Sequence, residues 1–216
     1  MSTAAAAEIV RCCRGLWDLG LIAGADGNVS VKLGPDRLLV TPRGVLKAEL
    51  GTEDLVEVDM AGRPVRGCRE ATTELDLHLR VYRRREDCGA VVHAHPPTAT
   101  GFAVTGQGLP GDVLSEIALL LGEVPCVPYA TTGTPALGDV VEPFLNRHVA
   151  LLLANHGALT WGRDLTQARI RMESLEHGAR ILAAARALGG LNRLTRDQLE
   201  ALERMRGNAS HGQHGY

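Results

Sequence analysis

The sequence predicts one mixed α/β domain that spans residues 1–216. Short segments that alternate apolar and polar residues at the period of a β-strand fill the first third of the chain, between clusters of turn-forming residues. Apolar residues recur at helical spacing through the last third. No repeat, charge block or Pro/Ser-rich linker divides the chain, and residues 207–216 have the composition of a polar tail. We therefore expect strands and helices to share a single core.

The composition excludes several broad classes of protein. The chain carries 23 Lys and Arg against 25 Asp and Glu, so its overall charge does not favour nucleic acid. Its longest apolar runs, such as Val149–Ala154, are far shorter than the roughly 18 residues of a membrane-spanning helix. The first residues lack the pattern of a secretory signal, and the odd number of five cysteines suits reduced thiols. We expect a cytoplasmic protein that acts on small molecules, without nucleic-acid or membrane partners.

Local patterns predict the elements of the first third. Helical spacing of apolar residues indicates a helix over residues 5–19. The Asp26-Gly27-Asn28 segment is typical of a turn, and alternation after it predicts a strand over 29–33. Two more extended segments are expected at 37–41 and 55–59.

The rest of the chain alternates between apolar segments and helical patterns. A helix is expected to start at Thr72–Thr73 and to run to about Arg85. Short buried strands are expected over 88–95 and 149–155. Capping-box spacing predicts two further helices, which begin after Asp164 and Thr195 and end near Leu188 and Met205.

A pair of histidines at the end of the 88–95 segment is the most informative local feature. Because side chains alternate along a strand, His93 and His95 point to the same face, with their Cα atoms about 7 Å apart. The 149–155 segment delivers His156 at its own end, and three imidazoles with an open position are typical of catalytic zinc. The alternative is that backbone carbonyls at a strand end satisfy these histidines. The spacing alone leaves both interpretations open.

Six short segments follow one another along the chain in a specific order. They are Gly27-Asn28-Val29-Ser30, Thr41-Pro42-Arg43-Gly44, Thr72-Thr73-Glu74, His93-Ala94-His95-Pro96, Pro128-Tyr129-Ala130 and Asn155-His156-Gly157. The ordered set resembles the class II aldolase and adducin family over about residues 8–205. This resemblance implies an α/β/α layered fold with a central, predominantly antiparallel sheet. It also implies a C4 homotetramer with active sites between neighbouring subunits.

The resemblance implies a metal site. His93, His95 and His156 match the family's three Zn²⁺ ligands, for which another divalent metal could substitute, and Glu74 matches the carboxylate beside the metal. Cleaving a C–C bond next to a ketone produces an enediolate, whose charge a divalent cation stabilises. A nearby carboxylate can move the proton, which is commonly worth about 10²- to 10⁴-fold in rate. The alternative for Glu74 is a first-turn glutamate favoured by the helix dipole.

A phosphate site is expected where two turns meet the start of a helix. Thr72 and Thr73 offer hydroxyls and backbone N–H groups at a helix N-terminus, a favourable place for an anion. Gly27 permits close approach of the backbone, Asn28 can donate from its amide, and the turn at Gly44 adds a further N–H. These five residues resemble the family's phosphate cradle.

Two departures from the family pattern bear on the substrate. Arg43 stands where relatives often carry a small hydroxyl residue, and its guanidinium could grip phosphate or carboxylate or could point into solvent. The segment Leu109–Gly122 contains no tyrosine, although family members that cleave fuculose phosphate use one there. Glu116 lies in this segment and resembles the acid–base glutamate of methylthioribulose-1-phosphate dehydratases. It could equally be a helix-start carboxylate.

The function that the resemblance implies is zinc-dependent aldol cleavage of a phosphorylated ketose. The substrate would be a ketose 1-phosphate such as L-fuculose 1-phosphate or a related deoxyketose phosphate, with dihydroxyacetone phosphate and an aldehyde as products. Glu74 and Glu116 are the candidate catalytic residues. Dehydration like that of methylthioribulose 1-phosphate, and 4-epimerisation of a pentulose phosphate, are the alternatives. A non-enzymatic adducin-like module is the alternative from another class of protein, but it would give no reason for the three histidines. His78, outside these motifs, is interpreted as a surface or packing residue.

Overall fold

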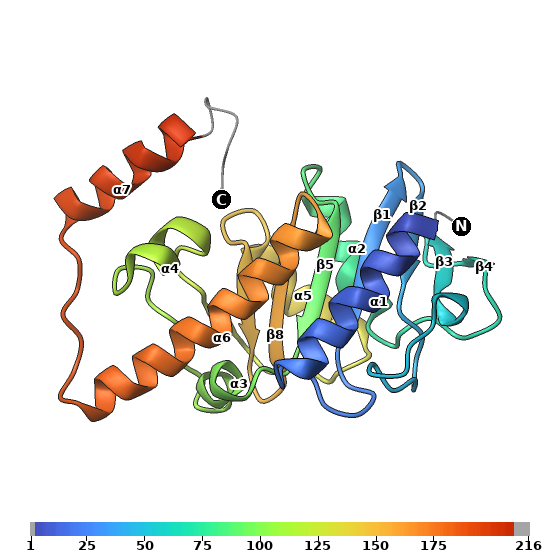
Figure 1. The fold of residues 1–216 in the computed structure, drawn as a ribbon, viewed down its shortest axis with the longest axis horizontal. Helices are drawn as coiled ribbons and strands as arrows, with labels where there is room; N and C mark the ends of the chain where they lie inside the picture. Colours follow the sequence, from blue (N-terminus) through green and yellow to red (C-terminus); the bar gives the residue numbers. More distant parts are fainter. Residues whose placement is uncertain (1–2, 210–216) are drawn as a thin grey trace.

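An eight-stranded sheet forms the middle layer of the structure, a computed structural model that describes residues 3–209 (Figure 1). In spatial order its strands are β4 (Pro64–Arg66), β3 (Val56–Asp59), β2 (Arg37–Val40), β1 (Asn28–Gly34), β5 (Ala90–Ala94), β8 (Gly157–Gly162), β7 (Ala150–Leu153) and β6 (Cys126–Val127). All neighbouring strands are antiparallel except β6 and β7, which are parallel. The prediction of a predominantly antiparallel sheet is therefore confirmed.

Helices cover both faces of this sheet (Figure 1). One face packs against α1 (Thr3–Asp18), α3 (Pro97–Val104), α4 (Ser115–Leu120) and α6 (Leu165–Ala187). The other face packs against α2 (Leu75–Arg84) and α5 (Pro135–Val141). Two short 3-10 helices, η1 (Thr52–Asp54) and η2 (Glu142–Phe144), lie in the connections, and α7 (Arg196–Ala209) packs against α4. This arrangement confirms the α/β/α layers.

Strand alternation divides the interior into two apolar cores. Along β5, Ala90, Val92 and Ala94 belong to the core under α1 and α6, whereas Val91 belongs to the core under α2 and α5. His93 follows Val91 by two residues, so it points to the α2 side of the sheet. The sheet thus directs His93 toward the helix that follows Glu74.

The structure adds elements that the sequence patterns did not predict. These include the strands β4, β6 and β8 and the helices α3 and α5. The strands β4 and β6 have only three and two residues, too few to show a period. Pro97 and Pro135 occupy the first positions of α3 and α5, where a missing N–H costs no hydrogen bond, although proline more often indicates a break.

Two predicted helix boundaries also change. The helix expected from Thr72–Thr73 begins at Leu75, and Glu74 is its N-cap residue rather than part of its first turn. The last helix continues to Ala209, into the predicted polar tail, and residues 210–216 of that tail lie outside the described residues. Within residues 3–209, none of the helices has the length and apolar character needed to cross a bilayer.

Candidate metal centre

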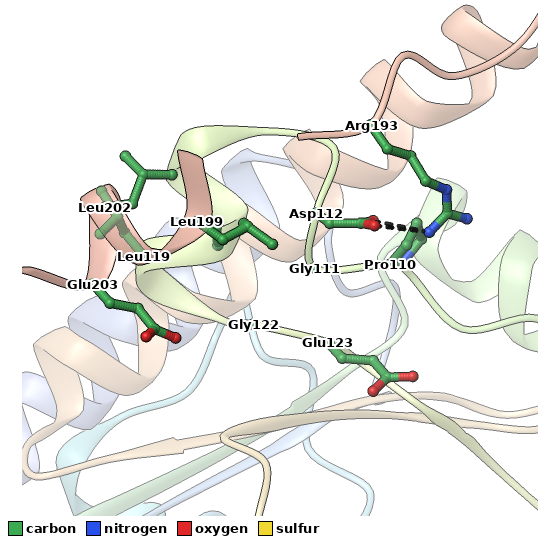
Figure 2. Close-up of a pocket in the computed structure, with 11 residues that line it drawn as sticks. Pro110, Gly111, Asp112, Leu119, Gly122, Glu123, Arg193, Leu199, Leu202 and Glu203 are labelled. Atoms are coloured by element: carbon green, nitrogen blue, oxygen red, sulfur yellow. Dashed lines mark hydrogen bonds and ion pairs between the residues drawn. The ribbon is translucent and has the colours of Figure 1, made fainter. Parts of the chain in front are cut away.

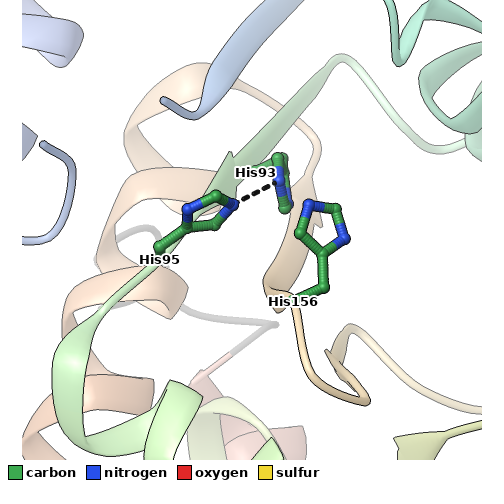
Figure 3. A group of neighbouring side chains, drawn as sticks. All are labelled: His93, His95 and His156. Carbon is green, nitrogen blue, oxygen red and sulfur yellow. Dashed lines mark hydrogen bonds between the residues drawn. The ribbon is translucent and has the colours of Figure 1, made fainter. Parts of the chain in front are cut away.

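Three histidines from two separate parts of the sheet converge at one point (Figure 3). His93 lies in β5, His95 follows this strand, and His156 lies in the turn between β7 and β8. One ligand nitrogen from each ring lies within 4.8 Å of the other two. His93 is fully buried and the other two are partly buried. The structure therefore brings together the histidines that the sequence singled out.

Hydrogen bonds determine which ring nitrogens carry lone pairs. His93 Nδ1 donates to the carbonyl oxygen of Ala158 at 2.9 Å, so Nε2 of the neutral ring carries the lone pair. His95 Nδ1 lies 3.5 Å from Asp26 Oδ2, which favours the same tautomer. The two Nε2 atoms are only 3.1 Å apart. Two lone pairs at this distance repel each other unless a cation or proton is shared between them.

Glu74 adds a carboxylate to the three imidazoles. Its Oε2 lies 3.2 Å from His93 Nε2, and its Oε1 lies 3.2 Å from His156 Nε2. Glu74 Oε1 and His156 Nδ1 are both buried and lack a hydrogen-bond partner among the described residues. Because buried polar atoms are normally paired, these atoms and the facing lone pairs fit a bound cation. Three imidazoles beside a carboxylate suit a divalent transition metal such as zinc.

Burial keeps His93 and His156 in the neutral form that binds metal. It lowers the pKa of His93 to about 3 and also lowers the pKa of His156, in both cases against the attraction of Glu74. For Glu74 itself burial acts to raise the pKa, but His93, the Asn28 hydrogen bond and His156 together bring the pKa below its usual value. At neutral pH His93 and His156 therefore present neutral nitrogens, and Glu74 presents an ionised carboxylate.

Two glycines allow the backbone to approach the histidines. A Cβ atom at Gly157 would lie 2.5 Å from His95 Cδ2, so any larger residue would displace this ring. Gly27 has a φ of 69°, and a Cβ there would lie 2.9 Å from the His93 carbonyl oxygen. Gly27 is therefore needed for both conformation and space, whereas Gly157 is needed for space.

The predicted phosphate-binding turns lie side by side before α2. The Thr72 N–H donates to the Thr41 carbonyl oxygen at 3.1 Å, and the Arg43 N–H donates to the Glu70 carbonyl oxygen at 3.0 Å. This pairing holds the turn that contains Gly44 next to the segment that leads into α2. The two segments, far apart in the sequence, thus form one surface.

The cradle residues differ in what they can offer an anion. Thr72 is buried, and its Oγ1 accepts a hydrogen bond from the Glu74 N–H at 3.3 Å, so its hydroxyl proton is its available donor. Thr73 is exposed and packs beside Gly133. Asn28 is buried and donates from Nδ2 to Glu74 Oε2 at 2.7 Å. Asn28 therefore connects the predicted phosphate cradle to the metal centre.

Arg43 lies at the exposed edge of this cradle. Its side chain is 64% exposed, and its guanidinium lies 3.7 Å from the carboxylate of Glu70, which is 83% exposed. Exposed ion pairs of this kind contribute little stability. The exposed position of Arg43 matches the solvent-facing alternative. To bind a substrate anion, Arg43 would have to give up only its weak ion pair with Glu70.

Glu116 does not lie in the histidine cluster. It is exposed in the first turn of α4 and lines a cavity of about 630 Å³ with His177 and Arg180 of α6. The described walls of this cavity include neither Glu74 nor the three histidines. Within one chain, Glu116 therefore occupies the position of a helix-start carboxylate.

A second cavity, of about 400 Å³, lies between α4 and α7 (Figure 2). Asp112 and Arg193 form an ion pair on one side of it at 3.0 Å, and Leu199 and Leu202 of α7 line another side. Its described lining contains none of the predicted site residues. This cavity is separate from the candidate metal centre.

Three residues beside the centre were not singled out as site residues by the sequence. Asp26 belongs to an Asp-Gly turn, which indicated only turn chemistry. Ala158 contributes a backbone carbonyl, for which no side-chain signal exists. His78 is fully buried, as the packing alternative expects, and its ring also contacts Asn28, so the surface interpretation was wrong. Its spacing of four residues from Glu74 was the available signal.

A family model matches most of the chain. The Class II Aldolase and Adducin N-terminal domain matches residues 7–183. Among solved structures, an L-fuculose 1-phosphate aldolase superposes with a TM-score of 0.89 at 30% sequence identity, over 95% of this chain and 97% of that chain.

Curated relatives extend this similarity to other substrates. A 5-deoxy-D-ribulose 1-phosphate aldolase from Bacillus thuringiensis serovar kurstaki is 36% identical over 90% of this chain and 92% of that protein. A 3-oxo-tetronate 4-phosphate decarboxylase from Pectobacterium atrosepticum is 33% identical over 82% of this chain and 83% of that protein. Both relatives are named for phosphorylated substrates.

Proposed function

Because the chain belongs to the class II aldolase and adducin family, it is a metal-dependent lyase, and we propose that it is a zinc-dependent aldolase. The proposed substrate is a ketose 1-phosphate, such as L-fuculose 1-phosphate or a related deoxyketose phosphate. The products are dihydroxyacetone phosphate and an aldehyde. The single observation that carries this proposal is the convergence of three imidazoles and a carboxylate inside one chain.

The metal would be held by His93, His95 and His156, with Glu74 beside it. When bound, the cation acts as a Lewis acid that stabilises the negative charge developing on the enediolate. The hydrogen bond of His93 to a backbone carbonyl orients its ring for this role. The neutral state of the buried rings keeps their nitrogens available at neutral pH.

Glu74 is the proposed acid–base residue. As the bond between C3 and C4 of the substrate breaks, the C4 hydroxyl loses its proton and becomes the aldehyde oxygen. Glu74, ionised at the start, takes up a proton and then delivers it to C3, which completes dihydroxyacetone phosphate and balances the proton lost from the hydroxyl. The carboxylate suits this role because Asn28 holds Oε2, while Oε1 has no hydrogen-bond donor among the described residues.

The cradle before α2 is the proposed phosphate site. Its members are Gly27, Asn28, Arg43, Gly44, Thr72 and Thr73. Hydroxyl and amide donors in this cradle would hold the phosphate next to Glu74, because Asn28 contacts that carboxylate directly. Arg43 would close the open side as a bidentate partner of the phosphate.

We also propose a cytoplasmic homotetramer with active sites between subunits. Glu116 lines a separate cavity of its own chain. A catalytic role for Glu116 therefore requires that it reach the histidine centre of a neighbouring subunit.

Dehydration of a ketose 1-phosphate is the second candidate function. Leu109–Gly122 contains no tyrosine, and Glu116 in this segment could serve as the acid for a departing hydroxyl. The reaction would use the same metal and phosphate groups. Epimerisation of a pentulose phosphate would use them as well.

Product analysis tests these assignments. The zinc-loaded protein is incubated separately with L-fuculose 1-phosphate, 5-deoxy-D-ribulose 1-phosphate, methylthioribulose 1-phosphate, a pentulose phosphate and 3-oxo-tetronate 4-phosphate. Release of dihydroxyacetone phosphate from a ketose 1-phosphate is the expected result. Water loss, an epimer or carbon dioxide as the sole product would replace the aldolase proposal with the corresponding reaction.

A further inference from the structure

A buried row of polar side chains leads away from Glu74 between β1 and α2. Asn28 and Ser30 alternate on the face of β1 that looks toward α2. His78 and Tyr82 follow Glu74 at intervals of four residues, so they lie along one side of α2. All five residues are at most 8% exposed. The row lies outside the three-histidine cluster but ends at its carboxylate.

The hydrogen bonds in this row can run in only one direction. An ionised Glu74 only accepts, so Asn28 Nδ2 donates to it at 2.7 Å. The Asn28 Oδ1 atom is then the acceptor for His78 Nε2, at 2.5 Å. Because Nε2 of the neutral ring carries the proton, Nδ1 accepts from Ser30 Oγ at 2.6 Å. Ser30 Oγ in turn accepts from the Tyr82 hydroxyl at 2.9 Å.

Reversing the direction of any one of these hydrogen bonds places two acceptors opposite each other. With its amide turned over, Asn28 would present an oxygen to the Glu74 carboxylate at 2.7 Å. With the other tautomer, His78 would present a lone pair to Asn28 Oδ1 at 2.5 Å. Such contacts are unfavourable in a buried site, where water cannot intervene. Burial also lowers the pKa of His78 to about 4, which keeps the ring neutral at neutral pH.

We propose that His78 is a positioning residue that fixes the orientation of the Asn28 amide and, through it, the carboxylate of Glu74. This inference rests on the proposed acid–base role of Glu74. Among the described residues, Glu74 is the one acceptor of the Asn28 amide nitrogen, so its second N–H remains for a substrate oxygen. His78 therefore keeps both Asn28 donors turned toward the reacting groups without touching the metal ligands.

Two substitutions of His78 separate positioning from packing. In His78→Gln the side-chain amide nitrogen can still donate to Asn28, whereas His78→Leu fills similar space without a donor. We expect His78→Leu to lower kcat roughly 10- to 100-fold at unchanged zinc content, as is typical for a residue that orients a metal-site group. His78→Gln should stay within about threefold of the unmodified protein, since its donor is retained.

Tyr82→Phe is the matched control from the same row. It removes the hydroxyl at the far end, but Ser30 can still donate to His78, so we expect kcat to change by less than about threefold. A purely structural role predicts a different pattern, in which all three variants lose melting temperature but keep the kcat of the folded, zinc-loaded protein. Equal kcat for His78→Leu and the unmodified protein would overturn the positioning role.

A readout independent of turnover is the tautomer of His78. In zinc-loaded protein labelled with ¹⁵N in histidine and asparagine, NMR should show His78 in the Nε2–H form near pH 7, and the Asn28 amide signals should shift in His78→Leu. An Nδ1–H or charged His78, or unshifted Asn28 signals, would contradict the inference. If the protein converts none of the phosphorylated sugars, the proposed function fails, while these spectra still decide whether His78 orients Asn28.

Discussion

The two candidate acid–base glutamates lie in opposite surroundings. Glu74 is 8% exposed, and its two oxygens face the Nε2 atoms of His93 and His156. Glu116 is exposed on α4, beside a cavity of about 630 Å³. The difference shows that one chain by itself brings the proposed metal ligands together, because all three histidines and Glu74 belong to that chain. A surface carboxylate such as Glu116 acquires a role only when a substrate or a second chain packs against it.

Removing one imidazole is the most direct test that a single chain supplies the ligands of the candidate metal centre. His93→Ala should abolish binding of about one zinc ion per chain and lower turnover by more than about 1000-fold, because the Lewis acid is lost. Elemental analysis and the cleavage assay measure both effects. His148→Ala, a histidine outside the centre, should leave both unchanged. Full zinc occupancy in His93→Ala, His95→Ala and His156→Ala would show that the centre is wrongly assigned.

Acidification should empty the same centre reversibly. Protons compete with the metal for the imidazoles, and burial lowers the pKa values of His93 and His156. Protons therefore displace the metal only at a lower pH than they would from ordinary histidines. Zinc content measured after equilibration at stepwise lower pH should reach its midpoint below about 6.5, the usual histidine pKa. A midpoint at or above that value would contradict the predicted effect of burial.

Glu74→Gln tests the buried glutamate without changing its shape. Turnover should fall by about 10²- to 10⁴-fold, because the amide cannot exchange a proton with the substrate. Zinc content and melting temperature should remain close to those of the unmodified protein, since the three imidazoles are untouched. Near-normal turnover would reject the acid–base role.

Arg43→Ala tests whether the exposed guanidinium beside the buried centre contributes to substrate binding. If the guanidinium grips the substrate phosphate, KM should rise by about tenfold with little change in kcat, since such a contact is made equally in the ground and transition states. Arg66→Ala, which removes an exposed arginine on β4, is the control. Steady-state kinetics that show an unchanged KM would support the solvent-facing alternative.

Glu116→Gln should have the smallest effect on aldol cleavage. Zinc can assist the hydroxyl that becomes the aldehyde, so we expect at least about a tenth of the cleavage rate to remain. The measurement is release of dihydroxyacetone phosphate. A dehydratase should instead lose about 10²-fold or more of its water elimination, because the departing hydroxyl needs an acid. That outcome, with no cleavage of any ketose 1-phosphate, would favour the second candidate function.

The parts of the site that the sequence could predict depend on local geometry. His93 and His95 lie two residues apart at a strand end, which is enough to place them on one side of the chain. The turn at Gly27 follows from a residue type that tolerates a positive φ and the close approach of a neighbouring backbone. The ordered motifs then connected these local features to a family, which the family match over residues 7–183 confirmed.

Several elements of the fold were beyond such reasoning. The strand β8 lies between β5 and β7 and is buried along its whole length, so it shows no alternation of apolar and polar residues. The helices α3 and α5 begin at prolines, which in a sequence more often indicate the end of a helix or strand. Their helical state depends on packing against the sheet rather than on local propensity.

The sequence by itself determined which chemical groups this protein carries and where short segments turn or extend, because these properties depend on neighbours within a few residues. Only the tertiary structure decided that Asn28 pairs with His93 across β1 and β5, and that His78 of α2 meets Asn28. It also decided that Glu116 stays apart from the centre. Contacts between distant residues depend on strand register and on which layer each element joins, and no local pattern contains that information.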